Sequence, residues 1–349
     1  MLKIGIVGLP NVGKSTLFKI ITKKQVDCSN YPFCTIDPNI GTVAVPDFRV
    51  DELVRVLNSQ KKIYTTIEFA DIAGLVKGAH KGEGLGNKFL EHIKETNAII
   101  YVLRAFFSQN VASTRQNIDP LEEKEILDTE MALKDLSLAQ KRVSDLEKQA
   151  RTGDKAVKKE LEIIKKVQGF LEEGRPLSEF SWNNEEQQTI KPYQFLTLKP
   201  KLCLINGKEN EISKNILNNL KESFIIMDIA TELAGMDFTP EEREELGLPK
   251  ETKINELVKK AYQLLDLITF FTIKSQETRA WAIKKGSTAP QAGGTVHTDF
   301  KEKFIKAEVI NWKELADSGG IHQARQKGLI RLEGKDYIVQ DGDVLEIKT

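Results

Sequence analysis

The sequence predicts an α/β fold with a largely parallel sheet, to which a helical hairpin and a small β-rich module are added. Short apolar segments rich in β-branched residues alternate with helical periodicity in the first part of the chain, a pattern typical of strand–helix–strand units. Helical periodicity dominates at about 119–176, and strand-like segments return after residue 265. We therefore expect one unit at 1–265, with the hairpin inserted in it, and a second at 266–349.

The first unit is expected to begin with a buried strand. Residues 2–7 are apolar and end at Gly8, and a helix is expected to begin near Lys14. A continuous apolar run is typical of a parallel sheet, because helices cover both of its faces. Further strands are expected at 41–45, 65–71, 98–103 and 200–205.

The middle segment is expected to form an antiparallel pair of helices. Apolar residues recur at alternating steps of three and four from Leu136 to Ala150, and the same rule continues from Val157 to Leu171. The chain is expected to turn between them near Gly153. The distal part, 141–166, carries nine Lys or Arg against five Asp or Glu, a net charge of +4. This surplus is typical of a solvated helical face, and it also suits contact with RNA phosphates.

The last unit is expected to be a β-rich module. Residues 267–273 are apolar and β-rich, 288–297 are rich in glycine and small residues, and 337–347 have the pattern of a strand, a turn and a strand. Its 13 basic and 12 acidic side chains do not favour nucleic-acid binding by total charge. Its aromatic residues are expected in a core rather than as stacking platforms for bases: Phe270, Phe271, Trp281 and Phe304.

The composition is that of a soluble globular protein. Among 349 residues there are 51 Lys and Arg and 51 Asp and Glu, and 40% are apolar, which argues against a disordered chain or a polycation. The three cysteines, Cys28, Cys34 and Cys203, are too few and too scattered for a disulfide framework or a paired-thiol zinc site. The sequence shows neither an apolar run of about 18 residues nor a cleavable leader. We therefore expect a cytoplasmic protein without a membrane partner.

Residues 8–15, GLPNVGKS, have the pattern of a phosphate-binding loop between a buried strand and a helix. In such a loop the glycines let backbone N–H groups point at the β-phosphate, and the helix N-terminus adds partial positive charge. Lys14 is expected to reach the β- and γ-phosphates, Ser15 to bind Mg²⁺, and Thr16 to lie near the α-phosphate.

Two further segments are expected to complete the phosphate and metal site. Asp71 ends a predicted strand and is expected to hold Mg²⁺ through a water, while the N–H of Gly74 meets the γ-phosphate. Thr35 lies in an extended segment with two prolines, 30–38, and is our choice for the second hydroxyl ligand of Mg²⁺. The alternative for Thr35 is an ordinary turn threonine.

Base recognition is expected at Asn206, Gly207 and Glu209, which follow a predicted strand. A typical GTPase has Asn-Lys-x-Asp there, and its aspartate accepts hydrogen bonds from N1–H and N2–H₂ of guanine. Here the lysine is displaced by one place and the acid is a glutamate. Adenine has no N1–H, so the change weakens the case for guanine and leaves both purines open.

Taken together, these segments resemble the YchF, or Obg-like ATPase, branch of the Obg-related P-loop NTPases. The matching segments, in order and spacing, are 8–16, 30–36, 71–79, 82–87 and Asn206-x-x-Glu209. The resemblance covers essentially the whole chain and implies a Ras-like G domain with an inserted helical arm and a C-terminal, β-grasp-like TGS domain. The chain departs from the family at 107–113, which lacks an acidic run, and at 225–228, which lacks the usual Ser-Ala pair.

The resemblance implies an NTPase that prefers ATP over GTP, associates with the large ribosomal subunit and acts as a cytoplasmic monomer. Carried over to the matching positions, it assigns phosphate contacts to Asn11, Val12, Gly13, Lys14, Ser15 and Thr16. It assigns Mg²⁺ to Ser15 and Thr35, and a base contact to Gly207 beside Asn206.

The residues expected to control hydrolysis depart from Ras-like enzymes. The glutamine that orients the attacking water there is replaced by Leu75, so slow intrinsic hydrolysis is expected. Our hypothesis is that His80, by family resemblance, or a ribosomal partner orients the water; a solvated loop residue is the alternative for His80. Asn11 resembles the asparagine with which some related NTPases bind K⁺ beside the phosphates, in place of an arginine finger.

Three functions stay open at this point. The first is an ATPase whose hydrolysis resets a ribosome-bound switch, and the second is a non-enzymatic adaptor for which ATP binding alone orders the loops. The third is a GTPase. Cys28 and Cys34 flank the segment around Thr35, so their oxidation is a further means of altering nucleotide affinity.

Overall fold

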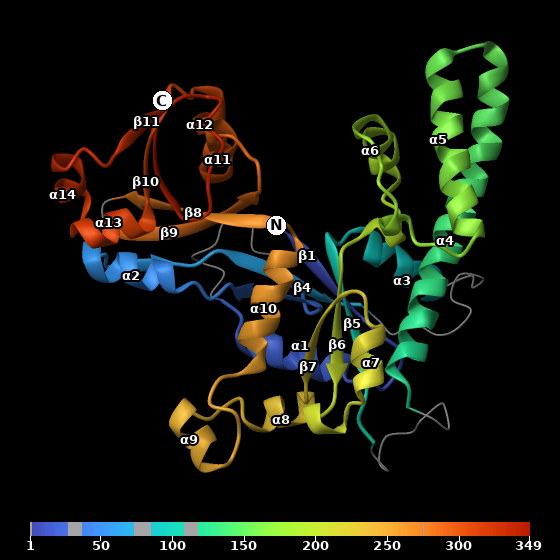
Figure 1. The fold of residues 1–349 in the computed structure, drawn as a ribbon, viewed down its shortest axis with the longest axis horizontal. Helices are drawn as coiled ribbons and strands as arrows, with labels where there is room; N and C mark the ends of the chain where they lie inside the picture. The colour runs from blue at the N-terminus through green and yellow to red at the C-terminus, as the bar shows by residue number, and fades with distance from the viewer. Residues whose placement is uncertain (1, 27–36, 73–84, 108–117, 275) are drawn as a thin grey trace.

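The computed structural model describes residues 2–26, 37–72, 85–107, 118–274 and 276–349 (Figure 1). These residues form two six-stranded sheets. The strands of the first sheet are, in spatial order, β2 (Ile40–Ala44), β4 (Thr66–Asp71), β1 (Lys3–Val7), β5 (Ala98–Arg104), β6 (Lys201–Asn206) and β7 (Ser223–Met227). Strand β2 runs antiparallel to β4, and all other neighbours are parallel. The predicted α/β fold is confirmed.

Helices cover both faces of the first sheet. On one face, α1 (Lys14–Lys23) and α10 (Lys253–Leu264) bury Leu17, Ile20 and Leu257 against the strands. On the other face, α3 (Leu85–Lys94) and the first turns of α4 (Pro120–Gln149) bury Leu90 and Leu127. Two short helices, α7 (Lys214–Asn219) and α8 (Ile229–Ala234), flank β7. Because the parallel strands share one direction, the loops after β1, β4 and β6 meet at one edge.

The inserted hairpin is formed by α4 and α5 (Lys155–Glu172). The helices pack through Ala139 and Leu146 of α4 and Ile164 and Val167 of α5. The chain turns at the predicted place, where Gly153 has φ 86°. A cap of short helices, including α6 (Asn184–Ile190), η4 (Leu177–Glu179) and η6 (Leu196–Leu198), packs against the hairpin. We call α4 beyond residue 135 together with α5 the arm.

The second sheet draws one strand from the N-terminal part of the chain. Its order is β11 (Arg331–Glu333), β10 (Lys306–Asn311), β12 (Asp343–Lys348), β8 (Leu267–Lys274), β9 (Glu277–Lys284) and β3 (Lys61–Ile63). Strand β3 and helix α2 (Phe48–Leu57) lie between β2 and β4 in the sequence. Helix α2 buries Val50 and Leu53 against Phe271 and Ile310 of the second sheet. Residues 48–63 are therefore packed with the C-terminal unit.

The strand predicted at the start of 337–347 is wrong. Ile338 makes only an isolated bridge to Thr288, and the segment is a loop held by Asp343, which accepts hydrogen bonds from Tyr337 Oη at 2.7 Å and Gln340 N at 2.8 Å. The small-residue stretch forms a helix that begins with a capping box of Thr288 and Gln291, and the missing Cβ of Gly293 lets this helix approach Phe300 closely. The helices of the described C-terminal unit are α11 (Ala289–Val296), α12 (Thr298–Glu302), α13 (Trp312–Ser318) and α14 (Ile321–Gln326).

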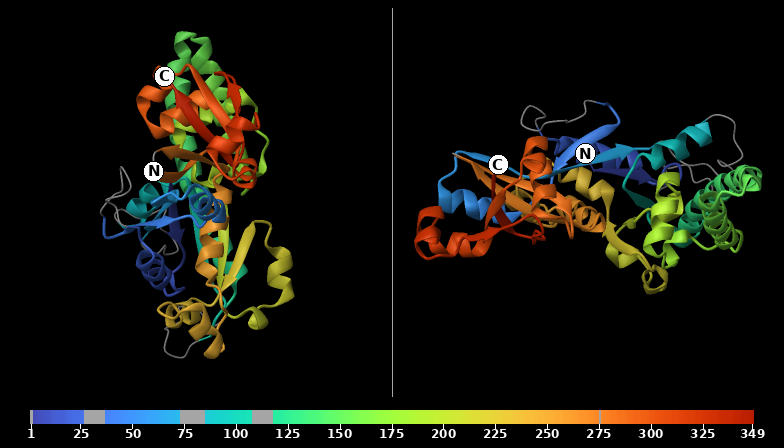
Figure 2. Two further views of the ribbon diagram at one scale, coloured as in Figure 1. Left: turned by 90° about the vertical axis from the view of Figure 1, so that its left-hand side faces the viewer. Right: turned by 90° about the horizontal axis from the view of Figure 1, so that it is seen from above.

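The four aromatic residues of this unit are mainly in its interior, as expected. Phe270, Phe271 and Phe304 are buried. Trp281 is half-buried, and the Arg279 guanidinium lies 4.1 Å from its ring centroid. The arm and the C-terminal unit project from the same side of the first sheet, and α9 (Pro240–Glu245) lies on the opposite side (Figure 1, Figure 2). Within the described ranges, no helix is long and apolar enough to cross a membrane.

Candidate nucleotide-binding site

The loop between β1 and α1 curls because two of its residues adopt left-handed backbone conformations. Asn11 has φ 63° and Gly13, at the N-cap of α1, has φ 104°. A Cβ atom on Gly13 would lie 2.6 Å from Asn206 Nδ2, so only glycine fits there. Gly8 is equally confined, because its Cβ would lie 2.6 Å from the carbonyl oxygen of Val102. The loop therefore turns tightly into α1, whose first N–H groups are free to bind an anion.

Lys14 lies inside the curl of this loop. Its Nζ donates a hydrogen bond to the carbonyl oxygen of Leu9 at 2.7 Å, and the residue is only 8% exposed. Burial lowers the pKa of Lys14, and the negative charges of Asp71 and Glu123 oppose this shift. An anion at the loop would act in the same direction as these carboxylates and favour the charged ammonium.

Asp71, at the end of β4, brings the second predicted segment to the loop. Burial raises the pKa of its carboxyl, while the charge of Lys14 and a hydrogen bond from the Ser15 side chain lower it in part. The structure therefore places Lys14, Ser15 and Asp71 together. A hydroxyl and a carboxylate side by side are oxygen ligands of the kind that Mg²⁺ prefers, so these residues fit the metal that the sequence predicts.

Asn206 joins the phosphate-binding loop to the loop after β7. Its Nδ2 donates to the carbonyl oxygen of Val12 at 2.9 Å, and its Oδ1 accepts from Ile229 N at 3.0 Å. The side chain is buried, so both ends of the amide are engaged within the protein. This bridging role did not follow from the sequence, because its partners lie in two distant loops.

The loops that follow β6 and β7 complete this edge of the first sheet. Gly207 N donates to the carbonyl oxygen of Met227 at 3.1 Å, and a Cβ on Gly207 would lie 3.0 Å from the oxygen of Ala105. Glu209 is exposed at the start of a short 3₁₀ helix. Asp228 caps α8 by accepting from Ala230 N at 3.1 Å. Asp228 therefore orders the loop that lacks the usual Ser-Ala pair.

Glu123 is a further residue of this region that the sequence did not single out. It lies in the first turn of α4, and its Oε2 accepts a hydrogen bond from Arg104 N at 2.8 Å. Arg104 is the last residue of β5 and pairs in register with Asn206 of β6. The N-terminus of α4 is thereby fixed to the edge of the sheet that carries Lys14 and Asn206.

Several predicted site residues lie outside the described part of the chain. They are Thr35, Gly74, Leu75 and His80, together with Cys28 and Cys34. Cys203 is described: it is buried in β6, and burial raises the pKa of its thiol to about 12. Its thiol is therefore unreactive near neutral pH.

A parallel α/β sheet with a curled glycine loop, a buried lysine beyond it and a hydroxyl–carboxylate pair defines a P-loop NTPase domain. Family models match both parts of the chain. Residues 3–141 match MMR_HSR1, described as "50S ribosome-binding GTPase", and residues 267–349 match YchF-GTPase_C, described as "Protein of unknown function (DUF933)".

Curated relatives are similar over nearly the whole chain. "Ribosome-binding ATPase YchF" of Bacillus subtilis (strain 168) is 41% identical over 99% of both chains, and the protein of that name from Escherichia coli O157:H7 is 43% identical over 98% of both. "Obg-like ATPase 1" of Oryza sativa subsp. japonica is 39% identical over 99% of this chain and 92% of its own length.

A solved structure gives the same result. The chain superposes on the Schizosaccharomyces pombe YchF GTPase with a TM-score of 0.87 and 35% identity, covering 99% of this chain and 97% of the other. The chain belongs to the YchF family of Obg-like P-loop NTPases.

Proposed function

We propose that this protein is a Mg²⁺-dependent ATPase with slow intrinsic hydrolysis, which associates with the large ribosomal subunit as a nucleotide-controlled switch in translation or the stress response. The observation that carries the enzymatic part is the convergence of Lys14, Ser15 and Asp71 at the N-terminus of α1. Ribosome binding rests on the printed names of relatives that match the chain along nearly its whole length. Because ribosomes act in the cytoplasm, this role implies a cytoplasmic protein, which we propose works as a monomer of two units, 1–265 and 266–349.

The proposed roles follow the predicted positions. Residues 11–16 bind the phosphates and Lys14 stabilises charge on the β- and γ-phosphates. Ser15 and Thr35 bind Mg²⁺, Asp71 does so through a water, and Gly74 meets the γ-phosphate. When bound by these residues, Mg²⁺ would neutralise negative charge on the phosphate groups. Gly207 and Glu209 contact the base, and Asn206 supports their loop.

His80 is our proposal for the group that orients the attacking water, since Leu75 has no polar atom to do so. A K⁺ ion held by Asn11 is proposed as a second cation beside the phosphates. Turnover of the His80→Ala variant, with and without ribosomes and in K⁺ or Na⁺, tests both roles. Equal rates under all of these conditions would refute them.

Competitive binding of ATP and GTP to the nucleotide-free protein tests the base preference. We expect tighter binding of ATP, because Lys208 is displaced by one place from the Asn-Lys-x-Asp pattern and the acid that would pair with guanine is Glu209, one methylene longer than aspartate. A clear preference for GTP would replace the proposed ATPase by a GTPase.

A non-enzymatic adaptor is the second candidate function, and Leu75 favours it because an apolar residue cannot orient water. The two functions differ in what they require of Lys14. A Lys14→Ala protein that still cycled on and off ribosomes normally would support the adaptor. Loss of cycling in a Lys14→Ala protein that still binds ATP but no longer hydrolyses it would support the ATPase.

We also propose that the tip of the arm contacts RNA phosphates. Four of the nine cations of 141–166 are held in ion pairs: Arg142 with Glu160, Lys159 with Glu185, Lys165 with Glu147 and Lys166 with Glu186. The other five make no ion pair within the described chain, and all of them except Lys141 lie within five residues of the turn at Gly153: Lys141, Lys148, Arg151, Lys155 and Lys158.

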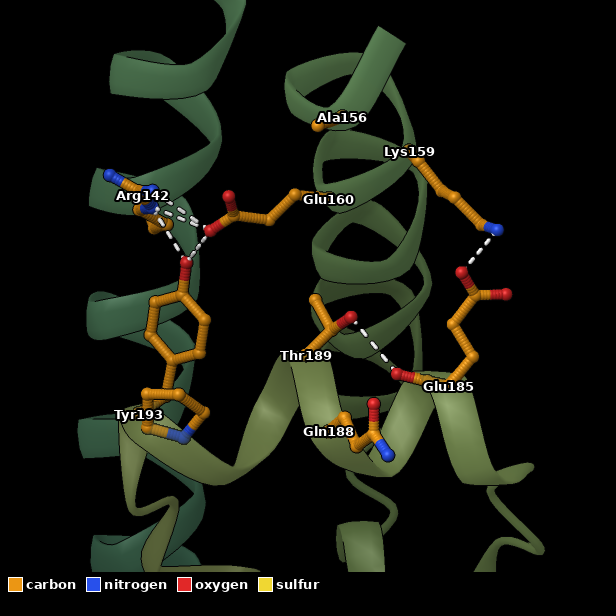
Figure 3. Close-up of a pocket in the computed structure, with 9 residues that line it drawn as sticks. Arg142, Ala156, Lys159, Glu160, Glu185, Gln188, Thr189 and Tyr193 are labelled. Carbon is orange, nitrogen blue, oxygen red and sulfur yellow. Dashed lines mark hydrogen bonds and ion pairs between the residues drawn. The ribbon is translucent and has the colours of Figure 1, made fainter.

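The pocket between α5 and α6 shows how the paired cations are used (Figure 3). This pocket of about 610 Å³ is lined by Arg142, Lys159, Glu160, Glu185 and Tyr193. Arg142 Nη2 lies 2.8 Å from Glu160 Oε1, and Arg142 Nε donates a hydrogen bond to Tyr193 Oη at 2.7 Å. These charges satisfy one another, so the pocket has a structural role and the tip provides the cations for a partner.

Replacing Arg151 and Lys155 by glutamate tests the tip. RNA binding should weaken, and the slope of log K against log salt should flatten by about one unit for each phosphate that the variant no longer neutralises. The matched control replaces Lys159 and Lys165, which are held in ion pairs, by glutamate, and this variant should weaken RNA binding less than the tip variant does. Binding that is independent of salt would contradict the proposal.

A further inference from the structure

Lys199, the residue that follows η6, binds the end of helix α3. Its Nζ donates to the carbonyl oxygens of Lys94, at 3.0 Å, and of Thr96. Lys94 is the last residue of α3, where backbone carbonyls have no partner within the helix and carry partial negative charge. Helix α3 follows the segment that contains Gly74 in the sequence. A single ammonium group therefore holds the end of the helix that comes after the proposed γ-phosphate contact.

Asp135 of α4 binds the start of η6, the short helix that directly precedes Lys199. Its Oδ1 accepts from Leu196 N at 2.9 Å, and its Oδ2 accepts from Thr197 N and from Thr197 Oγ1, both at 2.8 Å. Lys199 follows the 3₁₀ helix η6 that these amides begin. A continuous hydrogen-bonded path therefore runs from α3 through Lys199 and η6 to Asp135, the residue at which the arm begins.

The path is formed by groups whose burial has an electrostatic cost. Asp135 is completely buried, and burial raises its pKa to about 6 although three donors favour the carboxylate. Burial lowers the pKa of Lys199 to about 8; the charge of Asp135 opposes this shift, and that of Lys94 adds to it. Apolar side chains would fill the same space at lower cost, but only directional bonds fix how the three elements lie relative to one another.

The hydrophobic cluster to which both helices contribute does not fix that geometry. Leu90 and Ile93 of α3 and Leu127 and Met131 of α4 belong to one hydrophobic cluster, which also contains residues of β5, near the base of the arm (Figure 1). Such contacts hold two helices together but allow one to tilt or slide against the other. Beyond Asp135, α4 continues for about 21 Å at 1.5 Å per residue, so a tilt of about 5° would move its end by about 2 Å.

We propose that Lys199 and Asp135 are positioning residues that couple helix α3 to the arm, so that a movement of α3 caused by nucleotide is transmitted to the tip. This inference rests on the proposed nucleotide-controlled function. It assigns a route for the control, from the end of α3 to the turn of α4 that contains Asp135, and neither residue is among those that we propose to contact the nucleotide.

Hydrogen–deuterium exchange of the full-length protein, with and without a non-hydrolysable ATP analogue and Mg²⁺, tests the coupling. In the wild type the analogue should change exchange in the phosphate-binding loop, in α3, at 195–199 and in α4 around Asp135. In Lys199→Met the changes in the loop and in α3 should persist, while those at 195–199 and in α4 should be lost. Lys199→Arg retains the charge and should restore them.

Two further variants make the result specific. Asp135→Asn places an amide donor against one of the two N–H groups, that of residue 196 or that of residue 197, and should also remove the response of α4. Lys201→Met is the matched control, since Lys201 is a buried lysine that binds Asp128 of the same helix and not α3. It should leave the response of α4 in place.

The outcomes separate this inference from the proposed function. No protection of the phosphate-binding loop by the ATP analogue would argue against nucleotide binding itself. Protection of the loop with an unchanged α4 in the wild type would overturn the coupling alone. A response of α4 that persists in both Lys199→Met and Asp135→Asn would also overturn it.

Discussion

The convergence of Lys14, Ser15 and Asp71 could be predicted from the sequence because local motifs set their positions. A glycine loop between a strand and a helix allows few backbone paths, and an aspartate at the end of a parallel strand points to the same edge. The role of Asn206 could not be predicted in this way. Its amide connects Val12 with Ile229, and no pattern within one segment of the sequence indicates such a pairing.

Replacing Asn206 by alanine should weaken the binding of ATP and of GTP by a similar factor. The variant loses two buried hydrogen bonds that join the nucleotide loops, and at about 1 kcal/mol each this predicts a loss of about tenfold to a hundredfold. Isothermal titration calorimetry with both nucleotides measures it. A change in the ratio of the two affinities would instead show that Asn206 reads the base.

Glu209→Ala is the matched variant for this comparison. Glu209 is exposed and is the residue that we propose contacts the base. Its loss should change mainly the ratio of ATP to GTP affinity.

Helix α4 joins the first sheet to the arm through a network around Asp128. Asp128 Oδ1 accepts hydrogen bonds from Lys201 Nζ at 2.6 Å and from Tyr101 Oη at 3.0 Å, and Asp128 Oδ2 accepts one from Lys124 Nζ at 2.7 Å. Burial would raise the pKa of Asp128, but the positive charges of Lys201 and Lys124 outweigh it and hold the pKa below its ordinary value.

Replacing Asp128 by asparagine should lower the free energy of unfolding by about 3 kcal/mol near pH 7, because it leaves the buried Lys201 without a counter-charge. The folded pKa lies below the unfolded one, so this stabilisation is present above the unfolded pKa and is lost as the pH falls through the folded pKa. Urea unfolding should therefore show a constant difference above about pH 5 and a shrinking one below about pH 4. A difference independent of pH would contradict the ion-pair explanation.

The exposed pair of Lys23 and Asp237 is the control for this measurement. Asp237→Asn should change stability by less than about 1 kcal/mol at any pH, because water screens the pair.

The hairpin and five strands of the first sheet, β1, β2, β4, β5 and β6, could be predicted because their signals are local and repeated, whereas β7 was not predicted. Spacing by three and four residues specifies a helical seam, and Gly153 at φ 86° supplies the turn. Strand β3 has no such signal. It is three residues long and partly exposed, and its pairing with β9 joins positions 61–63 to 277–279. The predicted strand at the start of 337–347 failed because Asp343 holds that segment as a loop.

The two sheets are linked through residues 47–63. Arg49 of α2 binds Asp47 and, at 2.7 Å, Asp341 of the C-terminal unit, while Lys61 of β3 binds Glu277. The C-terminal sheet is therefore completed by residues that follow β2 directly in the chain. We expect the two parts to unfold in one cooperative transition rather than separately.

A double-mutant cycle of Arg49→Met and Asp341→Asn measures this link. We expect a coupling energy of about 1 kcal/mol, since the pair is charged and hydrogen-bonded but Asp341 is partly exposed. The control pair, Lys62 and Asp51, lies on the exposed side of the same segment and should couple by less. Two separate unfolding transitions in the wild type would show that residues 47–63 do not join the units.

The switch as a whole is tested most directly by steady-state hydrolysis of ATP and GTP, measured side by side with and without large ribosomal subunits. We predict slow hydrolysis of ATP by the free protein, a clear increase when ribosomal subunits are added, and no activity of Lys14→Ala under either condition. Hydrolysis that favours GTP, or a rate of ATP hydrolysis that ribosomal subunits leave unchanged, would contradict the account.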